Sequence, residues 1–141
     1  QVDAFVQGVG TGGSLRGNAE ILRKYNPNIH VVAVEPSESA VLSGESESSH
    51  KIEGIGAGFI VPLWKPELVT DIEKVSTEDA MAMARRLARE EGLFAGTSTG
   101  SNLIAALKKA KELGPKSTVV TLMVDTGMKY LSTALYGAPD K

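Results

Sequence analysis

Apolar and polar residues follow two different periods along this chain, and the changes between them mark the expected elements. Continuous apolar runs at residues 4–9, 30–35 and 118–124 predict buried strands. Apolar residues at helical spacing predict helices that begin near residues 14, 76 and 100. The first strand, first helix and second strand form a βαβ unit, which implies a parallel pair with a right-handed crossover. We therefore expect an α/β fold with a mostly parallel sheet.

Start and stop signals delimit the three helices. Asn26-Pro27 ends the first helix, Ser76 or Thr77 caps the second before Gly92 ends it, and Gly114-Pro115 ends the third. The residues expected on their packing faces are Leu15, Ala19, Leu22 and Tyr25, then Met83, Leu87 and Ala88, then Leu103, Ile104, Leu107 and Ala110. The polar segment 36–50 is expected to be an exposed loop with one short helical turn. The apolar segment 52–62 alternates with Gly54, Gly56 and Gly58, as a flexible connection would.

Composition excludes several classes of function. With 15 Lys and Arg against 17 Asp and Glu, the net charge is −2, which argues against nucleic acid as the main partner. The chain has no cysteine, which excludes disulfides and thiolate metal sites, and its two histidines, His30 and His50, lie far apart. No metal site is expected. No apolar run approaches the roughly 20 residues of a membrane helix, so we expect a cytoplasmic location. The start at Gln1, directly before a core strand, suggests a fragment or a processed piece.

The strongest chemical signal is a glycine-rich loop between the first strand and the first helix. Glycines allow a tight turn and let main-chain N–H groups approach a ligand closely, and a helix start adds free donors and partial positive charge. Residues Gly10 to Ser14 are therefore predicted to hold a phosphate group.

This loop alone allows more than one interpretation. Residues 8–13 satisfy the G-x-G-x-x-G dinucleotide fingerprint, and Glu35 ends the next strand 22 positions after Gly13, where an NAD-binding fold would bind ribose. An NAD-dependent oxidoreductase is one alternative, and a tight turn without a ligand is another.

Further segments point to one family. After the glycine loop come Val34-Glu35-Pro36, residues 39–44 and a glycine-punctuated loop at residues 51–59. They are followed by a second turn of small residues at 96–102 and by a segment at 125–133 that begins with an Asp-Thr-Gly turn. From Val2 to about Leu135 the chain resembles the C-terminal part of the cysteine synthases (O-acetylserine sulfhydrylases), which are fold type II pyridoxal-phosphate enzymes. The resemblance implies a three-layer, mostly parallel twisted sheet flanked by helices. It also implies that residues 1–141 are a single cofactor-binding domain from the C-terminal part of a larger enzyme.

The resemblance also assigns residues to roles. It implies that Gly10, Thr11, Gly12, Gly13 and Ser14 bind the phosphate of pyridoxal 5′-phosphate. Ser98 matches the serine that hydrogen-bonds the pyridine nitrogen, although a serine near a helix start is also a common N-cap. A neutral hydroxyl there makes the ring a weaker electron sink and favours elimination. Gly54, Ile55, Gly56 and Ala57 match the loop that lines the substrate entrance and closes over it.

Other polar residues are expected to be structural. Asp125 is interpreted as turn chemistry, and the resemblance leaves Glu35 with no ribose to bind. The family's Schiff-base lysine lies in the N-terminal part, outside this chain, so no catalytic residue is expected here and the isolated fragment should be inactive. Five lysines are expected at the surface: Lys24, Lys65, Lys108, Lys109 and Lys111.

The implied reaction of the parent protein is β-replacement, in which O-acetylserine and sulfide give cysteine and acetate. A cystathionine β-synthase-like enzyme is the nearest alternative, followed by the NAD-binding oxidoreductase and by a non-enzymatic binding domain. The resemblance further suggests a homodimer and serine acetyltransferase as a possible partner.

Overall fold

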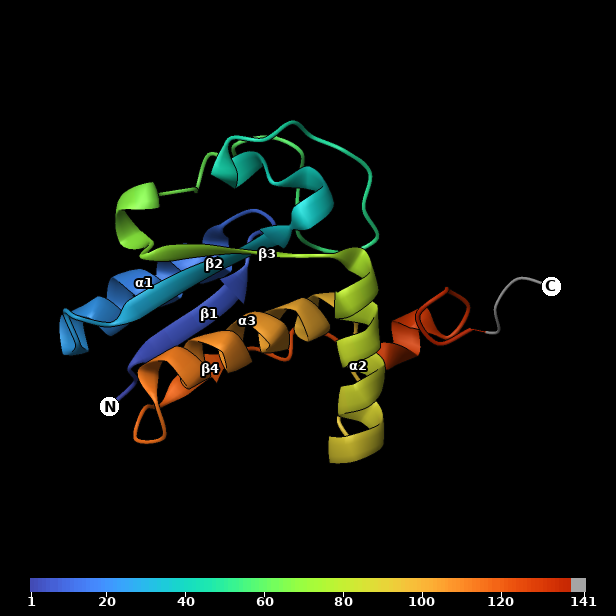
Figure 1. Ribbon diagram of the computed structural model, residues 1–141. Coiled ribbons are helices and arrows are strands. Elements are labelled where there is room, and N and C mark those ends of the chain that lie inside the picture. Colours follow the sequence, from blue (N-terminus) through green and yellow to red (C-terminus); the bar gives the residue numbers. More distant parts are fainter. Residues whose placement is uncertain (138–141) are drawn as a thin grey trace.

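The computed structural model describes residues 1–137 and shows a four-stranded sheet between helices (Figure 1). The strands are β1 (Ala4–Gly8), β2 (His30–Pro36), β3 (Asp71–Val75) and β4 (Val119–Thr121). The α-helices are α1 (Gly13–Tyr25), α2 (Thr77–Glu91) and α3 (Thr97–Leu113). Short 3₁₀ turns are η1 (Ser37–Ser39), η2 (Val41–Ser43), η3 (Pro66–Leu68) and η4 (Gly127–Tyr130).

All strands run parallel, in the order β3-β2-β1-β4. The central β1 is wholly buried and pairs with β2 on one side and with β4 on the other. One core lies between the sheet and α1, where Phe5 and Val9 meet Leu15 and Ala19. The second core lies between the sheet and α3. The α/β, parallel, three-layer prediction is confirmed.

The helix limits follow from local chemistry. Gly12 precedes α1 with a φ of 85°, a conformation that favours glycine. Ser76 caps α2, and its hydroxyl accepts a hydrogen bond from the N–H of Asp79. Gly92 ends α2 in the left-handed conformation, with a φ of 69°. The predicted limits of α1 and α2 are therefore close to the observed ones.

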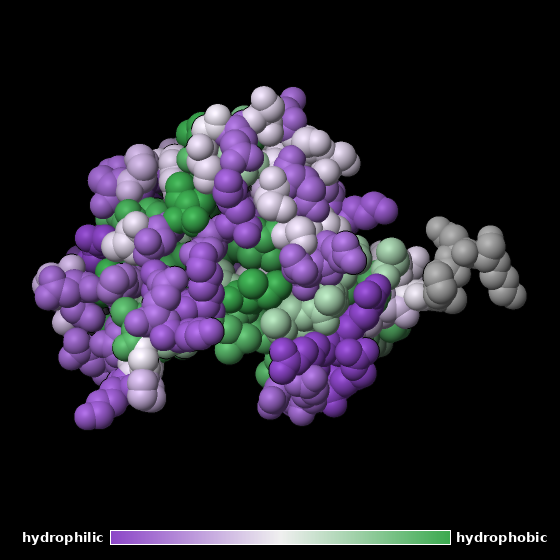
Figure 2. All heavy atoms as spheres, viewed as in Figure 1, coloured by the Kyte–Doolittle hydropathy of each residue, from purple (hydrophilic) through white to green (hydrophobic). Residues whose placement is uncertain are grey.

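The third helix starts earlier than predicted and buries a different set of residues. Helix α3 begins at Thr97 rather than near Gly100, and its buried face consists mainly of small and polar residues, with Leu107 left 51% exposed. The close approach of α2 explains this composition, because a side chain at Gly100 would collide with the backbone carbonyl of Ala80. In Figure 2, apolar residues show between polar patches on the face of the molecule that carries α3.

Several smaller predictions were wrong. Strand β3 was not predicted, and β4 covers only part of residues 118–124. Tyr25 is 85% exposed, although its spacing placed it on the packing face of α1. Segment 36–50 contains two 3₁₀ turns rather than one, and Ser39 and Ala40 within it are buried.

Lys109 was also expected at the surface but is 5% exposed. Its ammonium group donates hydrogen bonds to Asp71 at 2.9 Å and to Glu112 at 2.6 Å. These two carboxylates compensate the charge that α3 carries into the interface with the edge of the sheet.

No helix within residues 1–137 is both long enough and apolar enough to span a membrane.

Candidate functional site

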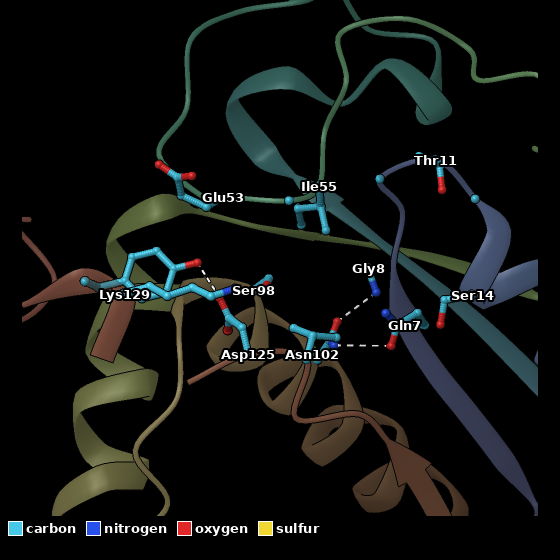
Figure 3. Close-up of a pocket in the computed structure, with 15 residues that line it drawn as sticks. Gln7, Gly8, Thr11, Ser14, Glu53, Ile55, Ser98, Asn102, Asp125 and Lys129 are labelled. Atoms are coloured by element: carbon cyan, nitrogen blue, oxygen red, sulfur yellow. Dashed lines mark hydrogen bonds between the residues drawn. The ribbon is translucent and has the colours of Figure 1, made fainter. Parts of the chain in front are cut away.

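A cavity of about 460 Å³ opens at the carboxyl ends of β1 and β4 (Figure 3). Its lining includes residues of the loop predicted to bind phosphate, of the glycine-punctuated loop and of the N-terminal part of α3. Parallel α/β sheets bind their ligands at this edge. The cavity therefore brings together three segments that the sequence analysis identified separately.

The glycine-rich loop forms one wall. Gly10, Thr11, Gly12 and Ser14 line the cavity, whereas Gly13, the first residue of α1, does not. The hydroxyl-bearing Thr11 and Ser14 are exposed, so both can reach a ligand in the cavity. The loop also lies at the N-terminus of α1, where unpaired N–H groups favour an anion.

The glycine-punctuated loop forms the opposite wall and contacts the first loop. Only Gly54 and Ile55 of its four predicted site residues line the cavity; Gly56 and Ala57 face a separate small hollow beside Val9. The N–H of Gly56 donates to the carbonyl of Val9 at 3.0 Å, which ties this loop to the end of β1. A Cβ at Gly10 would overlap the carbonyl oxygen of Gly54, so the two loops pack backbone against backbone.

Ser98 lies in the first turn of α3 and is only 4% exposed, yet it lines the cavity. The N-cap of α3 is Gly96, so the interpretation of Ser98 as the helix cap is wrong. The remaining prediction, a hydroxyl presented to a ligand in the cavity, is compatible with this position.

Asp125 anchors the start of α3. One carboxylate oxygen accepts a hydrogen bond from the N–H of Gly96 at 3.2 Å, and the other accepts from the hydroxyl of Tyr130. Burial of the Tyr130 phenol, together with its hydrogen bond to Asp125, raises the pKa of Tyr130 well above its usual range. Asp125 therefore acts in turn chemistry, as expected, and it also lines the cavity.

Sequence reasoning missed five polar residues that line the cavity: Gln7, Glu53, Asn102, Lys129 and Tyr130. Lys129 is exposed and was not among the lysines considered. Asn102 is wholly buried, and its contacts with Gly8 and Gln7 span more than 90 positions of sequence. A polar residue within the buried β1 was the only sequence signal for Gln7.

Glu35 does not face a ribose site. Its carboxylate is 2% exposed and accepts hydrogen bonds from the N–H groups of Leu42 and Ser43 at 2.8 and 3.0 Å, and from the Ser43 hydroxyl at 2.6 Å. These bonds organise the turn after β2. The NAD alternative rested on the glycine-loop fingerprint and on Glu35, and it loses the second of these supports.

The residues present fit pyridoxal phosphate. Gly10 and Gly12 line the cavity without side chains, and a side chain at Gly10 would displace the facing loop. Hydroxyls of Thr11 and Ser14 lie at this wall, whereas Ser98 lines the cavity from α3. The cavity can therefore bind a phosphate at the glycine loop and hydrogen-bond a pyridine ring through Ser98.

Comparison with known proteins defines the class. The chain belongs to the pyridoxal-phosphate dependent enzyme family, whose sequence profile matches residues 1–125. Its fold is that of the fold type II members, to which the similar structures belong.

Among curated relatives, the cysteine synthase of Staphylococcus aureus (strain N315) is 50% identical over 139 residues, which are 99% of this chain and 45% of that protein. The structure of O-acetyl serine sulfhydrylase isoform 3 from Entamoeba histolytica matches with a TM-score of 0.92 and 43% identity, over 99% of this chain and 42% of that one. An O-acetylserine dependent cystathionine β-synthase from Helicobacter pylori matches with a TM-score of 0.90 and 38% identity, over 96% of this chain and 44% of that one. The chain thus spans less than half the length of these relatives.

Proposed function

We propose that this chain is the cofactor-binding part of an enzyme that converts O-acetylserine and sulfide to cysteine and acetate. The observation that carries the proposal is the shared cavity, which joins the glycine loop, the Gly54 loop and Ser98. The 50% identity to a cysteine synthase over 99% of the chain supports the choice of substrate class.

Pyridoxal phosphate, when bound, supplies the electron sink that stabilises negative charge at the substrate α-carbon. The N–H groups of Gly10, Gly12 and Gly13 and the hydroxyls of Thr11 and Ser14 would hold the phosphate. The Ser98 hydroxyl would hydrogen-bond the pyridine nitrogen, and a neutral hydroxyl there would favour loss of a good leaving group.

The loop of Gly54, Ile55, Gly56 and Ala57 excludes water when substrate is bound. Positive φ values of 87° and 67° at Gly54 and Gly56 give it backbone conformations that other residues rarely adopt. The hydrogen bond from Gly56 to Val9 fixes one point of the loop, so that movement is expected on the Gly54 side, next to the cavity.

The Schiff-base lysine and the substrate carboxylate site belong to the N-terminal part of the parent protein. Residues 1–141 form its C-terminal cofactor-binding domain, of which residues 138–141 lie outside the described residues. We propose that the parent protein is a cytoplasmic homodimer and that serine acetyltransferase is a candidate partner.

The test is calorimetric binding of pyridoxine 5′-phosphate and of NAD to the full-length protein, followed by product analysis. Pyridoxine 5′-phosphate keeps the ring and the phosphate but has no aldehyde, so surface lysines such as Lys129 cannot capture it. Binding of this compound without NAD, and formation of cysteine from O-acetylserine and sulfide, are expected. Binding of NAD alone would refute the proposal.

The second candidate is a cystathionine β-synthase-like reaction, which the similarity to the Helicobacter pylori enzyme favours. The same assay with homocysteine in place of sulfide separates the two. Faster turnover with homocysteine would assign the chain to that reaction.

A further inference from the structure

Gln7 is a buried polar side chain that the proposed function does not yet use. It lies in β1, is 5% exposed and lines the cavity. Side chains alternate between the faces of a strand, so Gln7 lies on the same face as Phe5 and Val9, which pack against α1. That face leads to the glycine loop and the N-terminus of α1.

A chain of hydrogen bonds fixes the orientation of the Gln7 amide. The N–H of Gly8 donates to Oδ1 of Asn102 at 2.8 Å, which leaves Nδ2 of Asn102 as the donor to the carbonyl of Leu122 at 3.3 Å. The same Nδ2 donates to Oε1 of Gln7 at 3.4 Å. Because Nδ2 can only donate, the group of Gln7 that faces Asn102 must be its oxygen.

This orientation leaves the two N–H donors of Gln7 Nε2 without a hydrogen bond within residues 1–137. Nε2 is not enclosed within the protein, because the fully buried side-chain atoms without a partner among the described residues are Arg23 Nε and His30 Nδ1. It is therefore accessible and, since Gln7 lines the cavity, free to donate to an acceptor there. In Figure 3 Gln7 lies between Asn102, toward which its amide oxygen points, and Ser14 of the glycine loop, while Ser98 and Asp125 lie toward the other end of the cavity. The acceptor expected at the Ser14 end is the phosphate.

We infer that Gln7 Nε2 donates to the phosphate of the bound cofactor, and that Asn102 is the positioning residue that turns this donor toward it. The inference rests on the proposed cofactor site and adds a side-chain contact from β1 to the main-chain cradle of the loop. A neutral amide donor to a charged phosphate oxygen is a strong contact that does not require a lysine or an arginine.

The experiment measures the Kd of pyridoxine 5′-phosphate and of pyridoxine, which lacks the phosphate, for the full-length protein and for two variants. Gln7→Met keeps the volume but removes both donors, so it should weaken binding of the phosphorylated compound by roughly tenfold to a hundredfold. Binding of pyridoxine should stay within about twofold, because the inference places no contact between Gln7 and the ring. Ser98→Ala is the matched control and should weaken both compounds by the same factor.

Gln7→Glu keeps an oxygen for Asn102 but turns a carboxylate toward the phosphate, so its loss should exceed that of Gln7→Met. It also provides the test if Gln7→Met does not fold. Unchanged binding of pyridoxine 5′-phosphate to the folded variant, or an equal loss for both compounds, would overturn the role of Gln7. Failure of the wild-type protein to bind pyridoxine 5′-phosphate would instead refute the proposed function.

Discussion

The contact between Gly10 and Gly54 offers the sharpest test of how the cavity is built. Gly10 does not have a positive φ, so its backbone conformation is open to alanine. An added Cβ, however, would lie closer than 3.0 Å to the carbonyl oxygen of Gly54, and that oxygen belongs to backbone rather than to a movable side chain. The effect of Gly10→Ala is therefore steric.

Accommodating the methyl group requires the two loops to separate. Overpacking of this kind costs about 1–3 kcal/mol, and the upper end applies because the obstacle is backbone. Separation also moves the N–H groups of the phosphate wall. We expect urea denaturation to show a loss of about 3 kcal/mol in the free energy of unfolding, and cofactor retention to fall at least about tenfold.

Two other glycines provide matched controls. Gly17 lies exposed in α1 with no atom within 4 Å of an added Cβ, so Gly17→Ala should stabilise by about 0.5–1 kcal/mol. Gly44 has equally open surroundings but a φ of 86°, so Gly44→Ala reports backbone strain alone, at about 1–2 kcal/mol. If the free energy of unfolding of Gly10→Ala lay within about 0.5 kcal/mol of the wild-type value and the variant kept its cofactor, the tight packing of the two loops would be refuted.

Three further predictions concern single side chains. Ser98→Ala should weaken cofactor binding by less than about tenfold yet slow turnover, and unchanged turnover would show that the pyridine contact is unimportant. Glu35→Gln should lower the free energy of unfolding by about 2–3 kcal/mol in urea, because a charged acceptor of three hydrogen bonds is lost; a cost near zero would contradict this. Lys109→Met should lower the free energy of unfolding by about 2 kcal/mol at neutral pH, a loss between those for breaking an exposed and a fully buried salt bridge. Burial alone raises the pKa of Asp71, but the hydrogen bond and charge of Lys109 outweigh it and hold that pKa below its usual value. The stability gained from an Asp71 carboxylate with a lowered pKa is present above its unfolded pKa, so the cost of Lys109→Met should shrink as the pH falls through the lowered pKa in acid denaturation.

The sequence predicted the elements whose apolar periodicity is strong. Strands β1 and β2 and helices α1 and α2 appear close to their expected limits, because continuous apolar runs and capping residues leave few alternatives. Strand β3 was missed because its sequence, Asp-Ile-Glu-Lys-Val, is mostly charged, as suits the edge of a sheet.

The candidate site was predicted where a local motif reports it. Glycine-rich turns identify the two loops, but the contacts of Asn102 join positions that lie far apart in sequence. The start of α3 was missed because Thr97, Ser98, Gly100 and Ser101 look like a loop, whereas their small size is what lets α3 approach its neighbours. Composition alone could not separate these two situations.

The position of β1 in the middle of the sheet has a consequence for biosynthesis. Its partner β4 lies about as far away in sequence as this chain allows, with Ala4 opposite Val119. As the polypeptide leaves the ribosome, β1 can pair at first only with β2, and its other edge must wait for the last strand. The cavity depends on the same closure, since part of its wall comes from residues 124–130, which follow β4, and part from residues 7–14 at the end of β1. A nascent chain therefore has no site to offer the cofactor until nearly all of this sequence has been translated, which makes cofactor capture a late event.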